Sequence, residues 1–586
     1  MNSSPEGIQG LFLKTLEGEV SLPDEWNQLV LQMEVPQVFF TYEWALALER
    51  SFRSSAEPLI FALRRGEVLI GVAALACKPL SPEETFFLGA STADYCDIVS
   101  APEDRSLVVR ELLRALRRLG VRKVTLASIP HNSATIDALS QARSSGYWSS
   151  SRPAYICSRI VFKREAKNGA PKSIISSRTK DKLRRLSKLG PVKLVHLRER
   201  DEALGVLDSI VRAQISRFLA ALRASPLLLE ERRRFLEELI GLLSKKQWLD
   251  ISLLKVGERE IAWNLGFQFE GISFWYLPTF DISMESLSPG ACLLGLMMEE
   301  GSNEHSLKEI DLGLGDEGYK ARIANDSRAT FSFVLSSNAI IHAKFLVRES
   351  LTRLVKASSS CERAVRSFLR WANKLMGAAR REGVARMPGL LFKKVWEKAF
   401  KRDEIVFFEW PRTTISERGA ACTLQKMDWE NLAKSALDHS EDAATIEYLK
   451  RSAQRLKRAD QKCSQGFALT SETGTALHYC WITDFSGFKL EEIQHKLPAL
   501  KDALMIFDCW TPNSMRGMHY YAAAVEHVAQ ELHKQGKSGW IFSSTRNTPS
   551  LNALRKSSFV PRYSIIRRKL FFRMPVEELP AIRAKI

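Results

Sequence analysis

The chain of 586 residues has no long hydrophobic run. Its longest apolar segments, such as residues 291–298, fall far short of the roughly 18 residues that cross a bilayer. The N-terminus also lacks a basic segment followed by an apolar core and a small-residue cleavage site, so it does not read as a secretion signal. We therefore expect a cytoplasmic protein without a membrane span.

The content and spacing of cysteine, proline and glycine do not indicate any special class of protein. The nine cysteines are dispersed, with no C-x-x-C pair and no cysteine/histidine cluster at metal spacing. Neither a disulfide framework nor a bound metal is predicted. No excess of proline or glycine argues for a disordered or fibrous chain. The composition is that of a globular protein with several cores.

Positive charge is abundant and unevenly distributed. The formal net charge is +18, and residues 337–402 hold sixteen Lys and Arg against four Glu, which leaves +12 in that segment. Concentrated charge of this kind suits an anionic membrane surface or RNA, although a solvated helical connector is the simpler interpretation. DNA binding is not predicted, because no helix-turn-helix or finger pattern accompanies the charge.

The length predicts two to four domains. Three stretches repeat a helix that leads into a short strand, at residues 103–126, 288–312 and 516–542. Composition places the limits at 1–165 for a first half, 166–336 for a second half, 337–402 for the basic connector and 403–586 for a C-terminal domain.

Residues 251–323 carry the most information about function. Strand-like runs at 251–256 and 260–269 surround a turn and predict a hairpin, and a third run follows at 272–277. The sequence Ser288-Pro289-Gly290 then opens a helix, where main-chain N–H groups can bind a phosphate. Ser288 as a simple helix cap is the alternative.

Beyond these elements, the order of motifs resembles the CelD-type (cellulose-biosynthesis, BcsL-like) acetyltransferase family of the GNAT superfamily. The resemblance covers about residues 35–335. It depends on the turn and strand at 257–262, Phe280-Asp281, Leu287 to Gly290, and the stretch from Asp311 to Lys320. It implies an α+β fold with two GNAT halves in tandem, similar to Fem-type peptidoglycan aminoacyl transferases.

The resemblance also implies roles for single residues. Ser288, Pro289 and Gly290 would bind the diphosphate of acyl-CoA, and no metal is implied. Asp311, and after it Asp281, are candidates for accepting a proton, each at the end of an apolar strand; a carboxylate that only binds loop N–H groups is the alternative for Asp311. Candidates for substrate contacts are Tyr319, Lys320 and Arg184, against the alternative of a solvated surface.

The C-terminal domain resembles a third GNAT fold. Residues 507–521 look like a strand followed by an R-G-x-G-x-Y loop, and 547–550 look like N-x-P-S. The residues that would bind the acyl donor are Arg516, Gly517, Met518 and Asn547, and Asp508 is a candidate base. His519 stands where the loop normally has a second Gly, and Ser558 stands where Gly precedes Phe, so acyl-donor binding is less secure here than the fold.

The function that follows is transfer of an acyl group from acyl-CoA to an amine or hydroxyl. The resemblance places the acceptor among sugars or lipid-linked intermediates of cell-surface polysaccharide (cellulose or exopolysaccharide) biosynthesis. One alternative is Fem-like transfer from an aminoacyl-tRNA, although RNA is not the favoured partner. The other is a non-catalytic GNAT-fold scaffold of a polysaccharide assembly.

Overall fold

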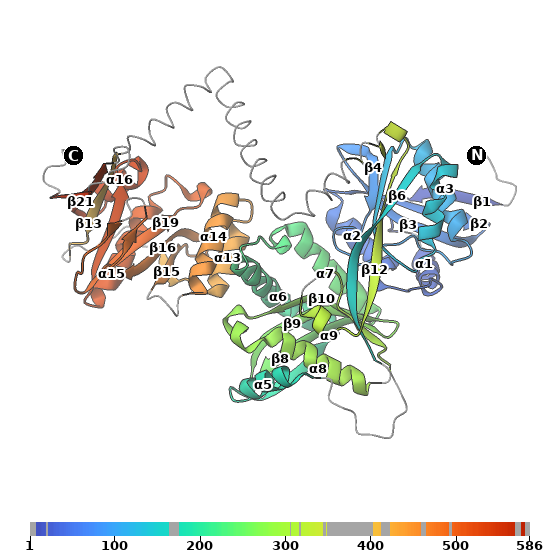
Figure 1. Cartoon of the computed structure of the whole chain (residues 1–586), viewed down its shortest axis with the longest axis horizontal. Helices are drawn as coiled ribbons and strands as arrows, with labels where there is room; N and C mark the ends of the chain where they lie inside the picture. The colour runs from blue at the N-terminus through green and yellow to red at the C-terminus, as the bar shows by residue number, and fades with distance from the viewer. Residues whose placement is uncertain are drawn as a thin grey trace, which may run out of the picture. The chain divides into compact units, whose positions relative to one another are not determined.

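A computed structural model describes residues 7–13, 15–18, 21–162, 175–304, 306–315, 318–340, 342–343, 347, 402–411, 422–458, 464–491, 495–568 and 576–580. They belong to two bodies (Figure 1). The first comprises residues 1–214 and 229–354, and the second 215–228 and 355–586. Nearly all of the predicted basic connector, 337–402, lies outside the described residues, and the four predicted domain limits stay a prediction.

One twelve-stranded sheet runs through the first body. Its strands are β1 (Ile8–Leu13), β2 (Glu57–Arg65), β3 (Val68–Lys78), β4 (Ser81–Phe87), β5 (Lys123–Pro130), β6 (Trp148–Val161), β7 (Val192–Leu197), β8 (Leu249–Val256), β9 (Arg259–Phe269), β10 (Ile272–Phe280), β11 (Glu309–Asp311) and β12 (Asp326–Ser336). The spatial order is β1-β2-β3-β4-β5-β12-β6-β11-β10-β9-β8-β7. Only the pairs β4–β5 and β10–β11 are parallel.

The two halves of this sheet have the same plan and exchange their last strands. In the first half, β4 runs parallel to β5, and in the second half β10 runs parallel to β11. The strand β12, which ends the second half, pairs with β5 of the first half, and β6, which ends the first half, pairs with β11 of the second. β6 and β12 also pair with each other, so neither half is complete alone.

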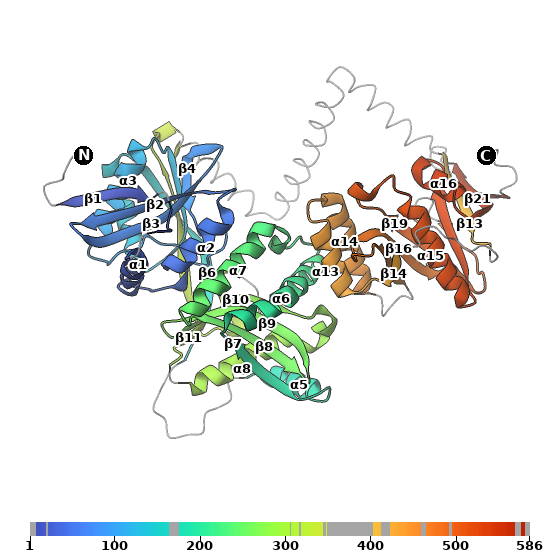
Figure 2. The ribbon, with the colours of Figure 1, turned by 180° about the vertical axis from the view of Figure 1, so that it is seen from behind.

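Helices cover both faces of the sheet. They are α1 (Leu22–Leu31), η1 (Val38–Phe40), α2 (Tyr42–Phe52), α3 (Arg105–Arg118), α4 (Thr135–Ser140), η2 (Ala142–Ser145), α5 (Ser177–Leu186), α6 (Arg200–Ala220), α7 (Glu230–Lys245), η4 (Ile282–Leu287), α8 (Pro289–Asn303) and α9 (Lys320–Ile323). In the second half, α5 and α8 lie on one face of β7 to β10 and α7 on the other (Figures 1 and 2). A short helix, η3 (Pro226–Leu228), belongs to the second body together with the end of α6.

The apolar face of α8 forms the core of the second half. Cys292, Leu293 and Met297 are buried against Leu254 and Ile261 of the hairpin β8–β9. The apolar residues of α8 recur at helical spacing, and burying them removes about 25 cal/mol of unfavourable hydration per Å² of apolar surface. This packing holds the start of α8 beside the last residues of β10 and the first residues of β9.

The second body contains an eight-stranded sheet. Its strands are β13 (Arg402–Glu409), β14 (Thr423–Lys426), β15 (Gln465–Thr470), β16 (Ala476–Asp484), β19 (Ala503–Trp510), β20 (Ser538–Ser544), β21 (Val560–Arg568) and β22 (Val576–Pro580), and a separate hairpin is formed by β17 (Lys489–Leu490) and β18 (His495–Lys496). The order is β14-β15-β16-β19-β20-β13-β21-β22, with β19 and β20 parallel.

The second body supplies its own inserted strand. β13 pairs with both β20 and β21, which is the place that an exchanged strand takes in the first body. The helices are α13 (Trp429–Asp438), α14 (Ala443–Leu456), η7 (Asn513–Met515), α15 (Tyr520–Lys534) and α16 (Thr548–Arg555). Val525, Val528 and Leu532 of α15 are buried against Ile506 and Ile541 of the parallel strands.

Several predicted elements are confirmed. The hairpin is β8 and β9, and the third run is β10. The three repeated stretches are α3–β5, α8–β11 and α15–β20. In all three, the helix connects two parallel, adjacent strands, which explains why helix and strand recur together.

Candidate functional site

The candidate site lies in the second half, where β10 and β11 separate. The two strands pair only through residues 272–274 and 309–311, and Asp311 lies opposite Phe274 in the last pair. Beyond this point β10 continues to Phe280 along β9, after a register shift between Phe274 and Leu277. Among the described residues, the other edge of β10 has no strand partner there. A free strand edge can bind an extended chain.

A left-handed residue begins the helix that follows β10. Ser288 precedes Pro289 at the start of α8 and has φ of +52°. Its side chain makes no capping hydrogen bond, so the simple helix-cap alternative does not describe it. Instead, Asp281 caps η4, accepting hydrogen bonds from the Ser283 amide at 2.9 Å and hydroxyl at 2.7 Å. Asp281 also pairs with Arg259 and is partly exposed, so the buried strand-end carboxylate that we expected is not found at this position.

The main-chain N–H groups at the start of α8 are only partly available. The Ser288 amide donates to the Glu285 carbonyl at 3.0 Å, and Pro289 has no N–H. The Ser288 carbonyl accepts from Ala291 and Cys292 at 3.1 and 3.2 Å. Within the described residues, the Gly290 amide has no acceptor, and a Cβ atom at Gly290 would meet only Phe280, at 3.5 Å. Of the three residues predicted to bind the diphosphate, only Gly290 therefore has an N–H group without an acceptor among the described residues.

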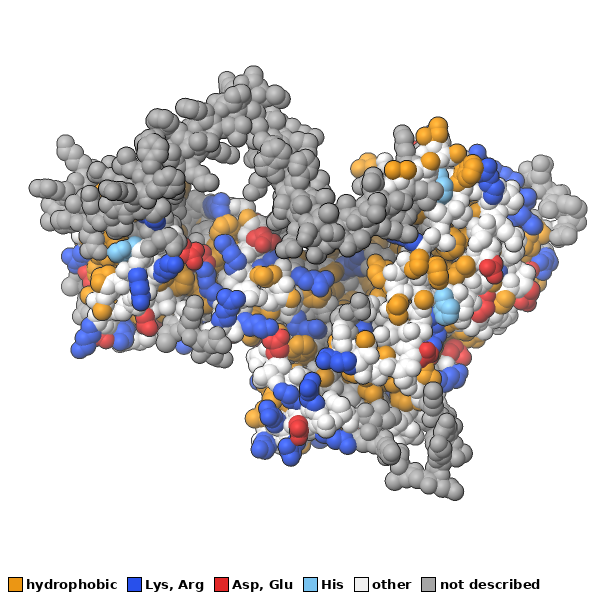
Figure 3. All heavy atoms as spheres, viewed as in Figure 1, with side chains coloured by type: hydrophobic (Ala, Val, Ile, Leu, Met, Phe, Trp, Pro, Cys, Tyr) orange, Lys and Arg blue, Asp and Glu red, His pale blue; other side chains and the backbone are white. Residues whose placement is uncertain are grey.

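Basic side chains border this helix start. Lys182 on α5 donates from Nζ to the carbonyl of Ser286 at 2.5 Å, two residues before Ser288. Lys and Arg side chains gather over α5 (Figure 3), where Arg178, Lys180, Arg184 and Arg185 are exposed. Arg184 pairs with Asp181 on the same helix at 3.0 Å. The surface beside the start of α8 is therefore cationic, and Lys182 contacts the loop 282–288 directly.

Asp311 is fully buried at the fork between β10 and β11. Its Oδ2 accepts a hydrogen bond from the Tyr95 hydroxyl at 2.8 Å, and its Oδ1 accepts from the Gly313 amide at 2.8 Å. Arg328 Nη1 lies 3.6 Å from Oδ2. Burial raises the pKa of Asp311, although the hydrogen bonds from Gly313 and Tyr95 and the charge of Arg328 oppose the shift.

Charged side chains from the exchanged strands surround this carboxylate. Arg328 on β12 lies 3.7 Å from Glu309 on β11, and Arg159 on β6 binds Glu309 at 2.6 Å. Arg328 Nη1 and Glu309 Oε1 are buried without a hydrogen-bond partner among the described atoms. The cluster therefore contains residues of both halves, because the exchanged strands β6 and β12 bring Arg159 and Arg328 to the fork.

Tyr319 and Lys320, which follow the fork, were predicted to contact substrate. Both side chains point into the protein instead. Tyr319 accepts a hydrogen bond on its hydroxyl from Trp275 at 3.2 Å. Lys320 is only 5% exposed, and its ammonium donates to the Leu314 carbonyl at 2.7 Å. Lys320 is thus neither a solvated surface residue nor a free cation, and it holds the loop that follows β11.

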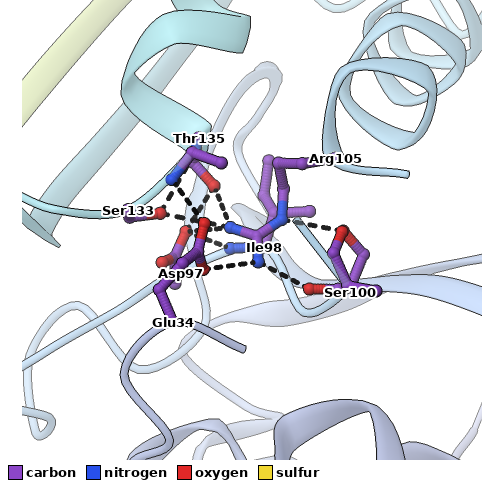
Figure 4. A network of polar contacts seen from close by, with 9 residues as sticks. Glu34, Asp97, Ile98, Ser100, Arg105, Ser133 and Thr135 are labelled. Carbon is purple, nitrogen blue, oxygen red and sulfur yellow. Dashed lines mark hydrogen bonds and ion pairs between the residues drawn. The ribbon is translucent and has the colours of Figure 1, made fainter. Parts of the chain in front are cut away.

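The corresponding place in the first half is filled by side chains. The helix α3 follows β4 as α8 follows β10, but its first residue, Arg105, is fully buried (Figure 4). Its guanidinium donates to the Ser100 hydroxyl at 2.7 Å, to Thr135 at 2.7 Å and to Glu34 at 3.3 Å. It also pairs with Asp97, whose pKa is raised by burial. The first half therefore does not repeat the partly exposed helix start of the second half.

The C-terminal candidates lie around the start of α15. Asp508 is in β19 at a register shift, has φ of +47° and pairs with Arg455. His519, in place of the expected Gly, has φ of +62° and precedes α15 as Ser288 precedes α8. Gly517 and Met518 are exposed in the loop, and the Asn547 side chain caps α16 through the Ser550 amide at 3.4 Å.

Sequence reasoning missed three residues of this arrangement. Tyr95 and Arg328 are far from Asp311 in sequence, and only the pairing of the halves brings them together. Lys182 is one of several basic residues on α5, and no local sequence pattern distinguishes it from its neighbours. The family resemblance also extends weakly to Asp94-Tyr95-Cys96-Asp97, and this was the available signal for Tyr95.

The part of the chain that the structure describes contains no group of three or more His, Cys, Asp or Glu side chains suited to a metal ion. Within the described ranges, no helix combines the length and the apolar character that crossing a bilayer requires.

Comparison with known families indicates an acyltransferase domain in the second half of the first body. Residues 176–321 match the family described as "Acetyltransferase (GNAT) domain". This segment contains α5, the fork of β10 and β11, and the start of α8. This segment is similar to that family, and the mixed α+β architecture of the chain contains GNAT folds. The narrower cellulose-biosynthesis family stays a prediction, and no curated protein matches the chain.

Three solved structures show a partial likeness to this chain. FemX is 11% identical, with a TM-score of 0.40 over 56% of this chain and 96% of its own. The C-terminal domain of a putative lysylphosphatidylglycerol synthetase from Agrobacterium fabrum is 12% identical, with a TM-score of 0.34 over 56% and 95%. A tandem GNAT protein from the clavulanic acid biosynthesis pathway is 10% identical, with a TM-score of 0.34 over 56% and 99%.

Proposed function

We propose that the second half binds an acyl-CoA at the start of α8 and transfers the acyl group to an amine or hydroxyl. The observation that carries the proposal is the fork of β10 and β11, followed directly by a helix start with a free Gly290 amide. A helix N-terminus favours the diphosphate of the donor, and Lys182 adds a positive charge. The edge of β10 that no described strand covers suits the pantetheine arm, which can bind as an added strand.

The chain's own residues fit such a ligand. Gly290 leaves open space at the helix start, because even a Cβ atom there would meet only Phe280 of the protein, at 3.5 Å. Phe280 lies at ordinary contact distance from that position and fixes the loop against the strand end. Ser288 in the left-handed region turns the chain from η4 into α8, so that the Gly290 amide stays free of the protein's own carbonyls.

Asp311 is our proposed proton acceptor. It occupies the last residue pair before β10 and β11 separate, which is where the reactive end of an acyl donor along β10 would lie. A general base works best when its pKa approaches the working pH, and burial moves the pKa of Asp311 in that direction. Tyr95 holds one carboxylate oxygen and the Gly313 amide the other.

The acceptor class follows from the family resemblance and not from the geometry. We propose a sugar or lipid-linked intermediate of cell-surface polysaccharide as the acceptor. Transfer from an aminoacyl-tRNA is the second candidate, because the cationic surface of α5 borders the site. The match to the acetyltransferase domain favours an enzyme over the scaffold alternative.

Binding of acetyl-CoA to the intact chain tests the proposal. A ligand at 100 times its dissociation constant adds about 2.7 kcal/mol to the folded state, so a rise in the midpoint of thermal unfolding is expected. Gly290→Glu should abolish the rise that the second half contributes, because its carboxylate would stand beside the helix start. Gly290→Ala is the matched control, since its methyl group would meet only Phe280. Equal binding by both variants would overturn the proposal.

A further inference from the structure

Four segments of the first body meet at one end of the strands of its first half. They are residues 78–84 at the turn from β3 to β4, 117–123 between α3 and β5, 143–148 at the start of β6, and 336–340 at the end of β12. Strand pairing places Lys123 opposite both Glu84 and Ser336. Ser336 also lies opposite Trp148. The four segments are therefore neighbours in space, although they are far apart in the sequence.

Large apolar side chains are exposed at this end. Leu80, in the turn between β3 and β4, is 97% exposed, and Leu119 and Ile340 are each more than half exposed. Trp148 is also exposed, and the Arg143 guanidinium lies over its ring at 3.1 Å. Single exposed apolar residues are ordinary on a protein surface, but several large ones at one end of a body indicate contact with an apolar partner.

Basic side chains accompany the apolar ones. The four segments contain two glutamates, Glu83 and Glu84, and six basic residues: Lys78, Arg117, Arg118, Arg122, Lys123 and Arg143. The glutamates lie within ion-pair distance of Arg122 and Lys123, which leaves an excess of positive charge. Hydrophobic and basic side chains lie side by side at this end, near α3 (Figure 3). The charge continues along the sequence, because Ser337 is the first residue of the basic segment 337–402.

The combination of charged and apolar side chains favours a membrane over other anionic partners. Lys and Arg are attracted to the anionic headgroups of a bilayer. A protruding aliphatic side chain such as Leu80 can enter the boundary between headgroups and acyl chains, where a Trp ring is also favoured. A nucleic acid attracts the same charges, but exposed aliphatic side chains contribute little to contacts with phosphates. An anionic bilayer therefore matches both properties of this surface.

We propose that this end of the first half, formed by residues 78–84, 117–123, 143–148 and 336–340, is a docking surface for an anionic membrane. Leu80, Leu119 and Trp148 enter the interfacial layer of the bilayer. Arg118 and Arg122, which are exposed beside them, bind the anionic headgroups. The contact is peripheral, and it is independent of the acyl-donor site at Gly290.

Co-sedimentation of the intact chain with lipid vesicles tests the role of charge. The vesicles consist of phosphatidylcholine with about one quarter phosphatidylserine, and pure phosphatidylcholine vesicles are the uncharged comparison. Arg118→Gln/Arg122→Gln should weaken binding to the anionic vesicles more than about ten-fold, since each charge at such a surface contributes about five-fold. Arg200→Gln/Arg234→Gln removes the same charge from exposed positions on α6 and α7, and it should weaken binding by about two-fold at most.

Leu80→Ser tests the apolar contact separately. It should weaken binding to the anionic vesicles about five-fold or more, because the leucine side chain leaves water when the protein docks. Val68→Ser is the matched control, since Val68 is exposed at the other end of β3 and should change the affinity by less than about two-fold. Both positions are exposed, so the midpoint of thermal unfolding should stay the same in both variants.

Three results would overturn the proposal. The first is that the unchanged chain does not bind anionic vesicles. The second is that it binds them, but Arg118→Gln/Arg122→Gln and Leu80→Ser bind no more weakly than their controls, which would place the contact elsewhere in the chain. The third is that Arg118→Gln/Arg122→Gln loses binding to a short single-stranded RNA while Leu80→Ser affects neither ligand, which would make this an RNA-binding surface. None of these results bears on binding of acetyl-CoA at Gly290, so the proposed function is tested apart from this surface.

Discussion

The hydroxyl of Tyr95 donates a hydrogen bond to the carboxylate of Asp311 at 2.8 Å, and this contact joins the two halves of the first body. Tyr95 lies between β4 and α3 of the first half, whereas Asp311 ends β11 of the second. Both side chains are fully buried. The proposed proton acceptor is therefore held by a residue of the half that has no free helix start.

Tyr95→Phe should lower stability and change the pH dependence of activity. Loss of one hydrogen bond to a buried carboxylate costs about 1–3 kcal/mol of unfolding free energy, which urea titration measures. The hydrogen bond also lowers the pKa of Asp311 against the effect of burial. Its removal should raise that pKa further, so the increase of activity with pH should occur at higher pH in the variant.

Tyr147→Phe is the matched control for this prediction. Its buried hydroxyl donates to the Val121 carbonyl at 2.7 Å within the first half. This variant should lose about 1 kcal/mol without any change in the pH profile. A pH profile of Tyr95→Phe equal to that of the unchanged chain would show that Asp311 does not accept the proton.

The exchange of strands predicts that neither half of the first body folds alone. A fragment of residues 1–165 contains β6 without its partners β11 and β12, and a fragment of residues 166–336 contains β12 without β5 and β6. Unpaired strands of this length promote association. Each fragment alone should aggregate or lack cooperative unfolding, whereas co-expression should give one soluble complex, as judged by gel filtration and circular dichroism. A monomeric fragment 1–165 with cooperative unfolding would contradict this.

Local patterns in the sequence predicted the helices and strands but not their partners. The apolar spacing in α3, α8 and α15 and the short strands after them were readable, because each depends on neighbouring residues. The pairing of β12 with β5 joins residues about 200 positions apart, and alternation along a strand does not specify its partner.

The candidate site was predictable to a similar extent. Ser288-Pro289-Gly290 correctly indicated a helix start, and Asp311 correctly marked the end of a strand. The number of free amides was not predictable, because it depends on where the Ser288 carbonyl points once the residue is left-handed. The charge pattern likewise did not separate Lys320, which is buried, from Lys182, which borders the site.

His196 should make the stability of the first body depend on pH. Its Nδ1 lies 2.9 Å from Asp250 on β8, and its Nε2 lies 2.8 Å from Glu300 on α8. Burial lowers the pKa of His196, but the hydrogen bonds and charges of the two carboxylates outweigh it, and the net pKa is raised above 6.5. The stabilisation is therefore full below pH 6.5 and is lost as the pH rises through the higher pKa of the folded state.

His196→Gln should accordingly unfold at a lower temperature than the unchanged chain at pH 5.5, by an amount that corresponds to about 1 kcal/mol. At pH 9 the two midpoints should nearly coincide. Glu300→Gln removes one of the two carboxylates and should show a smaller difference with the same sign. A difference that stays constant from pH 5.5 to pH 9 would show that the charge of His196 contributes nothing.

Lys182 should contribute to acyl-donor binding through its charge. It is the cation of α5 whose ammonium reaches the loop before α8, at 2.5 Å from the Ser286 carbonyl. Lys182→Gln should weaken coenzyme A binding to the second half by about three- to five-fold at low ionic strength, since a charge at the rim of a site contributes up to about 1 kcal/mol. Lys180→Gln, an exposed position on the same helix, should change it by less than about two-fold. The difference should shrink in 0.5 M salt, where the Debye length is only about 4 Å. If the two variants bind alike at low salt, the cationic surface of α5 attracts the ligand without a specific contact from Lys182.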